Sequence, residues 1–179
     1  SEKKGSPVRS FVRMCPANTP IRTSAPVESP DVIIVFHAAL LRNPATISGL
    51  RARGTLILNA APGPVPEVLK TLPKTARVIR IDALKIAVEE KSRPNAVLLG
   101  TLCAAYPFLT AEVVLAALSE EVAGKHPEAV KSNERAFNRG GTESEMLTGV
   151  GQAEGDLAPL RATPLWGYET APAGGILPV

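Results

Sequence analysis

Three short apolar runs recur at similar intervals in the first half of the chain, at residues 31–36, 54–60 and 77–82. Each run has the length of a β-strand, and the first, DVIIVF, contains no polar residue after its aspartate. Continuous apolar runs are typical of strands that are covered on both faces, as in parallel sheets. The first run is therefore predicted to be a central parallel strand.

Segments with helical character, residues 40–51 and 66–72, separate the three runs. Strands that alternate with helices form βαβ units, which cross over in the right-handed sense and build a doubly wound sheet. The fold class predicted from this alternation is α/β, with a three-layer, mostly parallel, Rossmann-like sheet.

The second half of the chain has the apolar spacing of helices. Four helices are predicted, over residues 83–91, 95–106, 110–124 and 127–139, and the last is expected to stop at Gly140. Residues 95–106 are apolar all round, which indicates a buried helix. Asp82 and Asn95 stand at the starts of two helices, where both residue types commonly act as N-caps.

The two ends of the chain have a different pattern. Residues 8–15 alternate arginines with apolar residues, which predicts a strand with one solvated face. Four prolines follow in residues 16–30, and because proline cannot donate to a strand ladder, this segment is predicted to be a loop.

From Leu147 onward the periodicity of helices and strands is lost, while glycine and proline recur. We expect residues 1–146 to form one α/β domain and residues 147–179 to form an extended arm, linking it to a partner subunit or a following domain. Trp166 and Tyr168 are the expected partner-binding residues of the arm, because these aromatic residues are common in binding hot spots.

Composition narrows the function classes. The net charge is only +3, the basic residues are scattered and aromatic residues make up 4%, so no nucleic-acid partner is expected. The longest uncharged apolar stretch, residues 95–109, is shorter than the roughly 20 residues of a membrane span, so no span is expected. The two cysteines cannot supply the four thiolates of an iron–sulfur cluster or a structural zinc site, and they favour a reducing, cytoplasmic compartment.

The segments that follow the three predicted strands form the candidate binding site, because ligands of open α/β sheets bind beyond the carboxyl ends of strands. His37 and Asn59 are candidate contacts in these segments, and Asn95, a polar residue at a helix start, is a third. The simpler interpretations stay open: His37 as an ordinary loop residue and Asn95 as an N-cap. The sequence contains no recognisable metal-ligand pattern and no catalytic constellation, so no catalytic or metal-binding residue is predicted.

Five segments, in order and at family-like spacing, carry a resemblance. They are residues 4–13 (KGSPVRSFVR), residues 29–36 (SPDVIIVF), Asp82-Ala83 with Ile86-Ala87, residues 95–100 (NAVLLG) and residues 133–140 (NERAFNRG). Together they resemble the gamma subunit, or gamma domain, of 2-oxoacid:ferredoxin oxidoreductases, the pyruvate synthase group.

The resemblance implies a function for a complex and not for this chain alone. The family oxidatively decarboxylates a 2-oxoacid, normally with coenzyme A, and passes electrons through iron–sulfur clusters to ferredoxin. Thiamine diphosphate, Mg and the 4Fe-4S clusters belong to alpha, beta and delta-type subunits, so this chain is expected to bind no cofactor alone. Its implied role is that of a non-redox subunit that contacts coenzyme A and supports assembly. The candidate contacts from the residue pattern, His37, Asn59 and Asn95, are expected on the coenzyme A side. Pyruvate, 2-oxoglutarate, branched-chain and aryl oxoacids and oxalate all stay open as substrates.

The sequence departs from the family pattern in two places. Gamma domains of the family open with a strand and a G-x-G-G-Q-G loop that this sequence lacks, so its sheet is expected to miss the first βα unit. Two explanations stay open: a fragment of a longer polypeptide, such as a fused gamma–delta subunit, or a variant without that unit. His37 stands where relatives usually carry aspartate. The end of the chain, from Trp166, resembles the linker to the ferredoxin-like domain of fused gamma–delta subunits. The alternative function is a stand-alone nucleotide-binding or regulatory α/β module.

Overall fold

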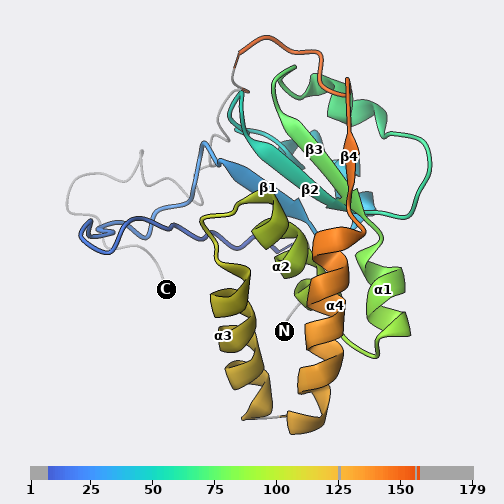
Figure 1. The fold of residues 1–179 in the computed structure, drawn as a ribbon. Helices are drawn as coiled ribbons and strands as arrows, with labels where there is room; N and C mark the ends of the chain where they lie inside the picture. The colour runs from blue at the N-terminus through green and yellow to red at the C-terminus, as the bar shows by residue number, and fades with distance from the viewer. Residues whose placement is uncertain (1–7, 125, 156, 158–179) are drawn as a thin grey trace, which may run out of the picture.

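The computed structural model describes residues 8–124, 126–155 and 157 (Figure 1). Within them the chain forms, in order, β1 (Val32–Val35), the 3-10 helices η1 (Ala38–Arg42) and η2 (Pro44–Thr46), β2 (Thr55–Asn59), the 3-10 helix η3 (Glu67–Thr71), β3 (Arg77–Ile81), α1 (Ala83–Glu89), α2 (Pro94–Ala105), α3 (Ala111–Ala123), the 3-10 helix η4 (Pro127–Ala129), α4 (Val130–Thr142) and β4 (Glu145–Leu147).

The sheet confirms the predicted α/β class. Its strand order is β1-β2-β3-β4, and the first three strands are parallel. Val32 of β1 pairs with Thr55 of β2, which in turn pairs with Arg77 of β3. β4 pairs with β3 in the antiparallel direction and was not predicted, because three residues with polar neighbours carry little strand signal.

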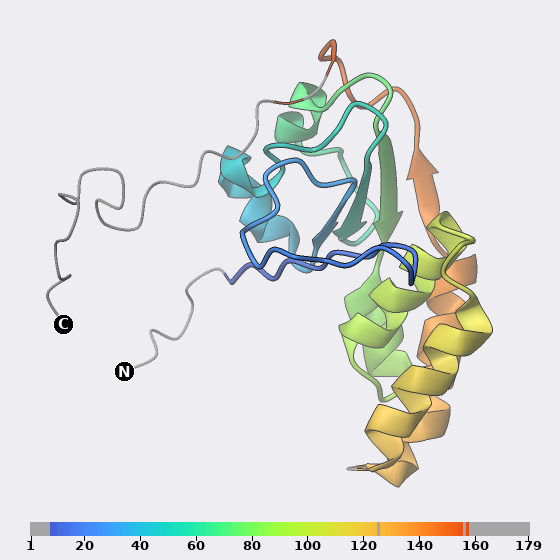
Figure 2. The same cartoon turned by 90° about the vertical axis from the view of Figure 1, so that its left-hand side faces the viewer.

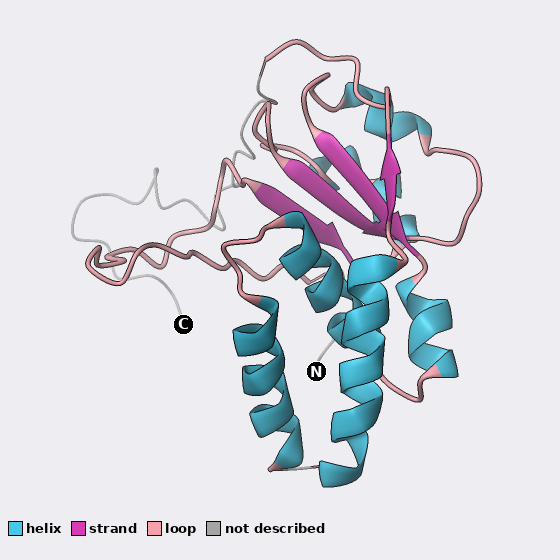
Figure 3. Ribbon diagram, in the orientation of Figure 1, coloured by secondary structure: helices cyan, strands magenta, loops and turns pink. Residues whose placement is uncertain are grey.

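Helical segments cover both faces of the sheet and make three layers, as Figures 2 and 3 show. One face of the central strands, represented by Ile57, Ile79 and Ile81, packs against α1, α2 and α4. The other face, which includes Leu56 and Leu58, packs against residues of the 3-10 segments. Side chains alternate between the two faces of a strand, and both faces are apolar, which explains the continuous apolar runs in the sequence.

The prediction of a central first strand is wrong. β1 lies at the edge of the sheet, with β2 on one side only. Its side chains are nonetheless apolar on both faces, because Ile33 packs against one core cluster and Val32 and Ile34 pack against the other. The apolar pattern of β1 is typical of a strand paired on both sides, whereas the described residues pair it on one side only.

The prediction of a strand over residues 8–15 is also wrong. Residues 8–30 form an excursion whose two legs run side by side without a strand ladder (Figures 1 and 2). The guanidinium of Arg13 joins the legs by donating to the carbonyls of Ala25 and Pro26, at 2.6 and 3.0 Å. Prolines in the returning leg have no N–H to donate, which prevents the regular ladder that the alternation alone suggests.

The helical segments between the strands are 3-10 helices of three to five residues. Asn43 ends the first of them and caps the second by accepting a hydrogen bond from the N–H of Ala45. Turns this short lack the length that an α-helix needs to compensate for its costly nucleation.

The predicted helices of the second half are all present, with changes at their ends. The first ends at Glu89, and residues 127–129 of the fourth form the 3-10 helix η4 before α4. Asp82 caps α1 through its carboxylate, which accepts from the N–H of Lys85 and confirms its expected role. Asn95 is not an N-cap, because α2 begins one residue earlier at Pro94 and follows Arg93. α4 does not stop at Gly140 but continues to Thr142.

A close contact between α2 and α4 explains why the glycines stay inside the helix. A Cβ added at Gly100 would collide with the carbonyl oxygen of Phe137, and one added at Gly140 would collide with the carbonyl oxygen of Val97. The buried hydroxyl of Thr101 donates to the carbonyl of Gly140 at 2.8 Å. The glycines therefore serve packing between two backbones, and not helix termination.

The start of the predicted arm packs on the domain itself. Leu147 lies in β4, and Val150 and Leu157 pack against the second core cluster. The N–H of Gln152 donates to the carbonyl of Leu72, and the N–H of Lys74 donates to the carbonyl of Ala153. Residues 147–155 and 157 thus lie against the α/β domain of this chain, and the expected anchors Trp166 and Tyr168 lie outside the described residues.

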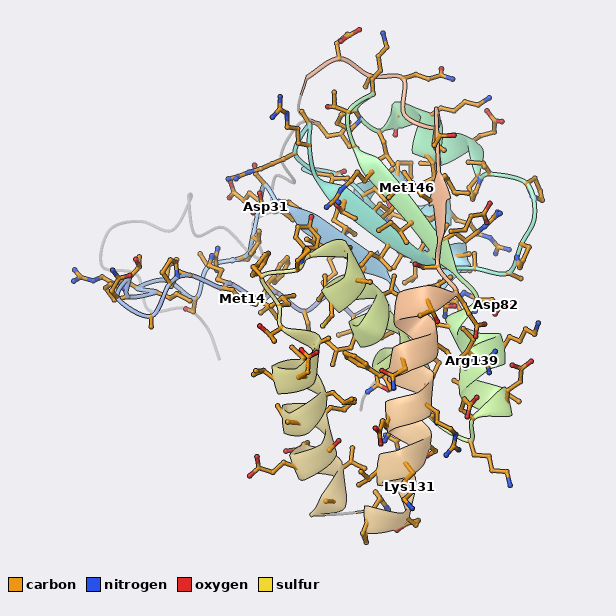
Figure 4. All side chains as sticks on the ribbon, viewed as in Figure 1. Met14, Asp31, Asp82, Lys131, Arg139 and Met146 are labelled. Carbon is orange, nitrogen blue, oxygen red and sulfur yellow. The ribbon has the colours of Figure 1, made fainter. Side chains whose placement is uncertain are left out.

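A network of charged side chains joins α1 to α4 (Figure 4). Arg139 forms ion pairs with Glu89, Glu90 and Glu143 at 2.8, 3.0 and 2.5 Å. Arg135 adds a second pair to Glu90 at 2.6 Å. Hydrogen bonds from Arg135 and Arg139 lower the pKa of Glu90, and those from Arg139 lower the pKa of Glu143.

No helix in the described part of the chain is long and apolar enough to cross a membrane.

Gly140→Ala is expected to destabilise the domain strongly, and Gly141→Ala is the matched control in the next position of the same helix. The first adds a methyl group against the backbone of α2, whereas the second brings it no closer than 3.6 Å to another residue. Urea unfolding should show a loss of about 3 kcal/mol or more for Gly140→Ala. Gly141→Ala should be neutral or gain up to about 1 kcal/mol. Equal effects of the two substitutions would contradict the packing role of Gly140.

Arg139→Gln is expected to lower the urea midpoint near pH 7 by an amount that shrinks in acid. Glu90 and Glu143 have folded-state pKa values below their ordinary 4.5, so the stability they add is present above pH 4.5. It is lost as the pH falls through the lower, folded-state values, and the variant then approaches the original protein. Lys70→Gln, which removes only the exposed pair with Glu67, should change stability by less than about 1 kcal/mol. A constant difference for Arg139→Gln down to pH 3 would contradict this origin.

Candidate functional site

The three loops after β1, β2 and β3 meet at the carboxyl edge of the sheet, as the sequence predicts. Asn59 at the end of β2 joins them through its side-chain amide. Its Nδ2 donates to the carbonyl of Phe36 at 2.8 Å, and its Oδ1 accepts from the N–H of Ala83 at 2.9 Å. Asn59 therefore fixes the position of both neighbouring loops, and its amide is engaged within the chain.

His37 lies in the first of these loops with an exposed side chain. Its Nδ1 accepts a hydrogen bond from the N–H of Ala39 at 3.1 Å and caps η1. A ring nitrogen that accepts from an amide carries no proton itself, so the other ring nitrogen of the neutral imidazole, Nε2, is the donor. His37 is thus both a structural cap and an exposed hydrogen-bond donor beside the sheet edge.

Asn95 is not brought to this edge. It is exposed in the first turn of α2, which follows the end of α1 distant from Asp82. Nearby, Ser92 hydrogen-bonds to Asn133 in the first turns of α4, whereas the sheet edge meets residues that follow α4. His37 and Asn59 therefore lie at the same edge of the sheet, whereas Asn95 lies beyond the far end of α1.

A small cavity of about 170 Å³ opens at the carboxyl ends of β2 and β3. Its lining is mixed in charge and consists of Ala60, Pro62, Arg80, Ile81, Asp82, Lys85, Ile86, Glu143 and Glu145. The volume is below the roughly 300 Å³ at which pockets begin to enclose a drug-sized ligand. The cavity can therefore contact one part of a larger ligand but cannot enclose it.

Arg80 is a largely buried charge in the wall of this cavity. Its side chain is 12% exposed and donates to Glu145 of β4 at 2.6 Å and to the carbonyl of Gly63 at 2.7 Å. Arg80 is not among the residues predicted from the sequence, although an arginine between the apolar residues Ile79 and Ile81 of a strand was an available signal. What the sequence could not show was β4, which supplies the paired carboxylate.

The charges around the cavity partly compensate each other. Asp82 is engaged in capping α1, and Glu143 is held by Arg139, whose hydrogen bonds lower the pKa of that carboxylate. Lys85 lies 3.9 Å from Glu89 with an exposed ammonium group. Among the groups that line the cavity, Lys85 is consequently the most accessible cation for an anionic ligand group.

The described residues contain no group of three or more histidine, cysteine, aspartate or glutamate side chains that could hold a metal ion. Cys15 is exposed on the N-terminal excursion, and Cys103 is buried in α2, where burial raises the pKa of its thiol. A raised thiol pKa reduces the thiolate fraction and makes Cys103 a poor nucleophile. The arrangement at the sheet edge is suited to contacting a polar ligand by hydrogen bonds and charge.

Known proteins are similar to this chain in sequence. Pyruvate synthase subunit PorC of Methanosarcina barkeri is 40% identical over 106 residues, which cover 58% of this chain and 56% of that relative. The chain therefore matches little more than half the length of that relative. The common gamma subunit of the pyruvate/ketoisovalerate oxidoreductases of Pyrococcus furiosus is 30% identical over 150 residues, covering 82% of this chain and 77% of that protein.

A solved structure has the same fold. The pyruvate oxidoreductase subunit PORC of Thermotoga maritima superimposes with a TM-score of 0.57 at 29% identity, covering 67% of this chain and 66% of that one. The model of the pyruvate ferredoxin/flavodoxin oxidoreductase family matches residues 1–143. With most of its length matched by that model, the chain belongs to the pyruvate ferredoxin/flavodoxin oxidoreductase family.

Proposed function

We propose that the chain is the gamma-type, non-redox subunit of a thiamine diphosphate-dependent 2-oxoacid oxidoreductase, which supports assembly and contacts coenzyme A. The family match over residues 1–143 is the observation that carries the proposal. Relatives named as subunits of pyruvate synthase and of pyruvate/ketoisovalerate oxidoreductases add support for a 2-oxoacid as substrate. In this proposal alpha, beta and delta-type subunits are the partners, and ferredoxin accepts the electrons.

The residues of this chain do not fit the redox groups of such a complex. A 4Fe-4S cluster needs four cysteine thiolates, and the sequence has only two cysteines, one exposed on the excursion and one buried in a helix. The proposal therefore assigns the clusters, thiamine diphosphate and Mg to the partner subunits. The contribution of this chain is to bind and orient.

The contact with coenzyme A is placed at the carboxyl edge of the sheet. Coenzyme A carries phosphate groups, and the edge offers the accessible ammonium of Lys85 and the imidazole donor of His37. Asn59 binds the loop that carries His37 and the first residue of α1, the helix that carries Lys85, so its role is to position both groups. Because the cavity is small, the rest of the ligand must lie on a partner subunit.

The isolated chain is expected to be inactive. Purified alone, it should contain no thiamine diphosphate by mass spectrometry and no iron–sulfur absorbance, because those groups are assigned to the partners. Native mass spectrometry of the complex from its source should show this chain together with larger subunits. A monomeric peak in size-exclusion chromatography of a crude extract would instead favour the stand-alone nucleotide-binding or regulatory module.

His37→Asn is expected to raise the KM for coenzyme A in the assembled complex about tenfold with little change in kcat, as loss of a binding contact does. Asparagine keeps the cap of η1, because its side-chain oxygen can replace Nδ1 as the acceptor, so the loop should stay folded. The matched control is His126→Asn, which changes an exposed histidine before η4. An unchanged KM for His37→Asn would remove His37 from the coenzyme A contact and leave the assembly role untouched.

A further inference from the structure

Arg80 and Glu145 form an ion pair whose two partners differ in their contact with water. The side chain of Arg80 is 12% exposed, whereas that of Glu145 is 56% exposed. A charge that is mostly buried needs a counter-ion, because water solvates it poorly. A carboxylate that is more than half exposed is solvated by water and gains little from an ion pair. Arg80 therefore requires an anion at this place, but Glu145 does not require Arg80.

The guanidinium of Arg80 is oriented independently of Glu145. Its Nη1 donates to the carbonyl of Gly63, in the loop after β2, at 2.7 Å. Its Nε and Nη2 both donate to one oxygen of Glu145, Oε2, at 3.1 and 2.6 Å. These two groups form one side of the guanidinium fork, whose parallel N–H groups match two oxygens of a carboxylate or phosphate. Glu145 thus occupies the fork with a single oxygen, and the bond to Gly63 keeps the fork in place without it.

The backbone of Glu145 stays beside Arg80 whether or not the ion pair is closed. The two residues are partners in the antiparallel ladder of β3 and β4. β4 is anchored at both ends, because α4 precedes it and Leu147 packs against the second core cluster. Rotation about the side-chain bonds of Glu145 is therefore enough to open the pair, and no strand has to move.

The charge of the cavity at the carboxyl ends of β2 and β3 depends on this one side chain. Its lining has two cations, Arg80 and Lys85, and three carboxylates, Asp82, Glu143 and Glu145. Asp82 and Glu143 each accept a hydrogen bond from another part of the chain, at 3.0 and 2.5 Å. With Glu145 in place the carboxylates outnumber the cations, which opposes an anionic ligand. Once the carboxylate of Glu145 turns into solvent, the two signs balance and the fork of Arg80 is open.

We propose that Glu145 is a releasable internal counter-ion, which occupies Arg80 until a phosphate group takes its place. Arg80 then binds two phosphate oxygens through Nε and Nη2, and the ammonium of Lys85 faces the same group from across the cavity. The cavity of about 170 Å³ accommodates one such group and not the whole of a larger ligand. The affinity for the ligand is lowered by Glu145, because only molecules with an open pair can bind it.

A carboxylate ligand fits the cavity less well than a phosphate group. It offers Arg80 the same chemistry as Glu145, which the chain already holds at a high effective concentration. A phosphate group carries more negative charge and a third oxygen, which Lys85 can reach when Arg80 holds the other two. The inference rests on the proposed function only for the source of the ligand, since coenzyme A supplies phosphate groups.

The test measures binding of inorganic phosphate and inorganic pyrophosphate to the purified chain, with acetate at equal ionic strength for comparison. Isothermal titration calorimetry gives the affinity, and the NMR signal of the Arg80 Nε–H group identifies the site. We expect both phosphates to shift this signal in a saturable way. Acetate should bind at least about fivefold more weakly, because it has less charge and one oxygen fewer.

Glu145→Gln distinguishes a releasable counter-ion from a purely structural ion pair. The substitution keeps the shape of the side chain and removes its charge. A releasable counter-ion predicts that phosphate binds the variant at least about fivefold more tightly, because the competitor is now neutral. A structural ion pair predicts unchanged or weaker binding. The matched control is Glu154→Gln, which removes an exposed carboxylate paired with Lys74 and should change the affinity less than about twofold.

Substitution of the two cations tests their separate roles. Arg80→Lys keeps the charge but loses the fork, so it should weaken phosphate binding about tenfold, also when combined with Glu145→Gln. Lys85→Gln changes an exposed side chain and should weaken binding at least about threefold. Its control is Lys131→Gln, an exposed lysine of α4 that lies away from the sheet (Figure 4) and should have less than about a twofold effect. Circular dichroism checks that each variant is folded.

Three outcomes would overturn the proposal: no saturable phosphate binding to Glu145→Gln, no gain in affinity over the original chain, or binding that leaves the Arg80 signal unchanged. Displacement of phosphate by coenzyme A would identify coenzyme A as the source of the group. Phosphate binding that coenzyme A does not displace would support the counter-ion and contradict the coenzyme A contact at this edge. Conversely, a raised KM for His37→Asn without phosphate binding at Arg80 would overturn this inference and leave the proposed function standing.

Discussion

The backbone contact between α2 and α4 is the constraint on which the rest of the domain depends. Gly100 and Gly140 allow the two helices to touch, and the buried hydroxyl of Thr101 links them. The two helices meet backbone to backbone, with no side chain between them that could change its rotamer and adjust their spacing. They therefore pack as one unit. This unit covers the face of the sheet that carries Ile79 and Ile81, and it brings α1 and α3 into place around it.

The carboxyl edge of the sheet follows from that constraint. α4 delivers Glu143 beside α1 and leads directly into β4, whose Glu145 then meets Arg80. Asn59 completes the arrangement by joining the loops after β1 and β3. Nearly every polar group there has a partner within the chain, so the edge is rigid and suited to presenting contacts to a ligand held mainly elsewhere. This is the behaviour expected from the supporting role proposed for the chain.

Within the described residues, the chain pairs and covers one edge of its sheet but not the other. At the β3 side, β4 and residues 147–155 and 157 cover the sheet edge and its neighbouring loops. At the β1 side, apolar side chains and arginines line one groove. Uncovered apolar surface and unpaired strand edges both carry a cost in water.

The sequence by itself determined the class of the fold and much of its content. Continuous apolar runs identified the three parallel strands, and cap and spacing signals identified the four helices, because these signals act between residues close in the chain. The meeting of three loops at the carboxyl edge also followed, since it is a consequence of parallel order. Only the tertiary structure decided that Gly140 lies inside a helix, that β4 pairs with β3, and that Asn95 is separated from His37 and Asn59. Those features depend on contacts between segments far apart in the chain, whose geometry no local pattern records.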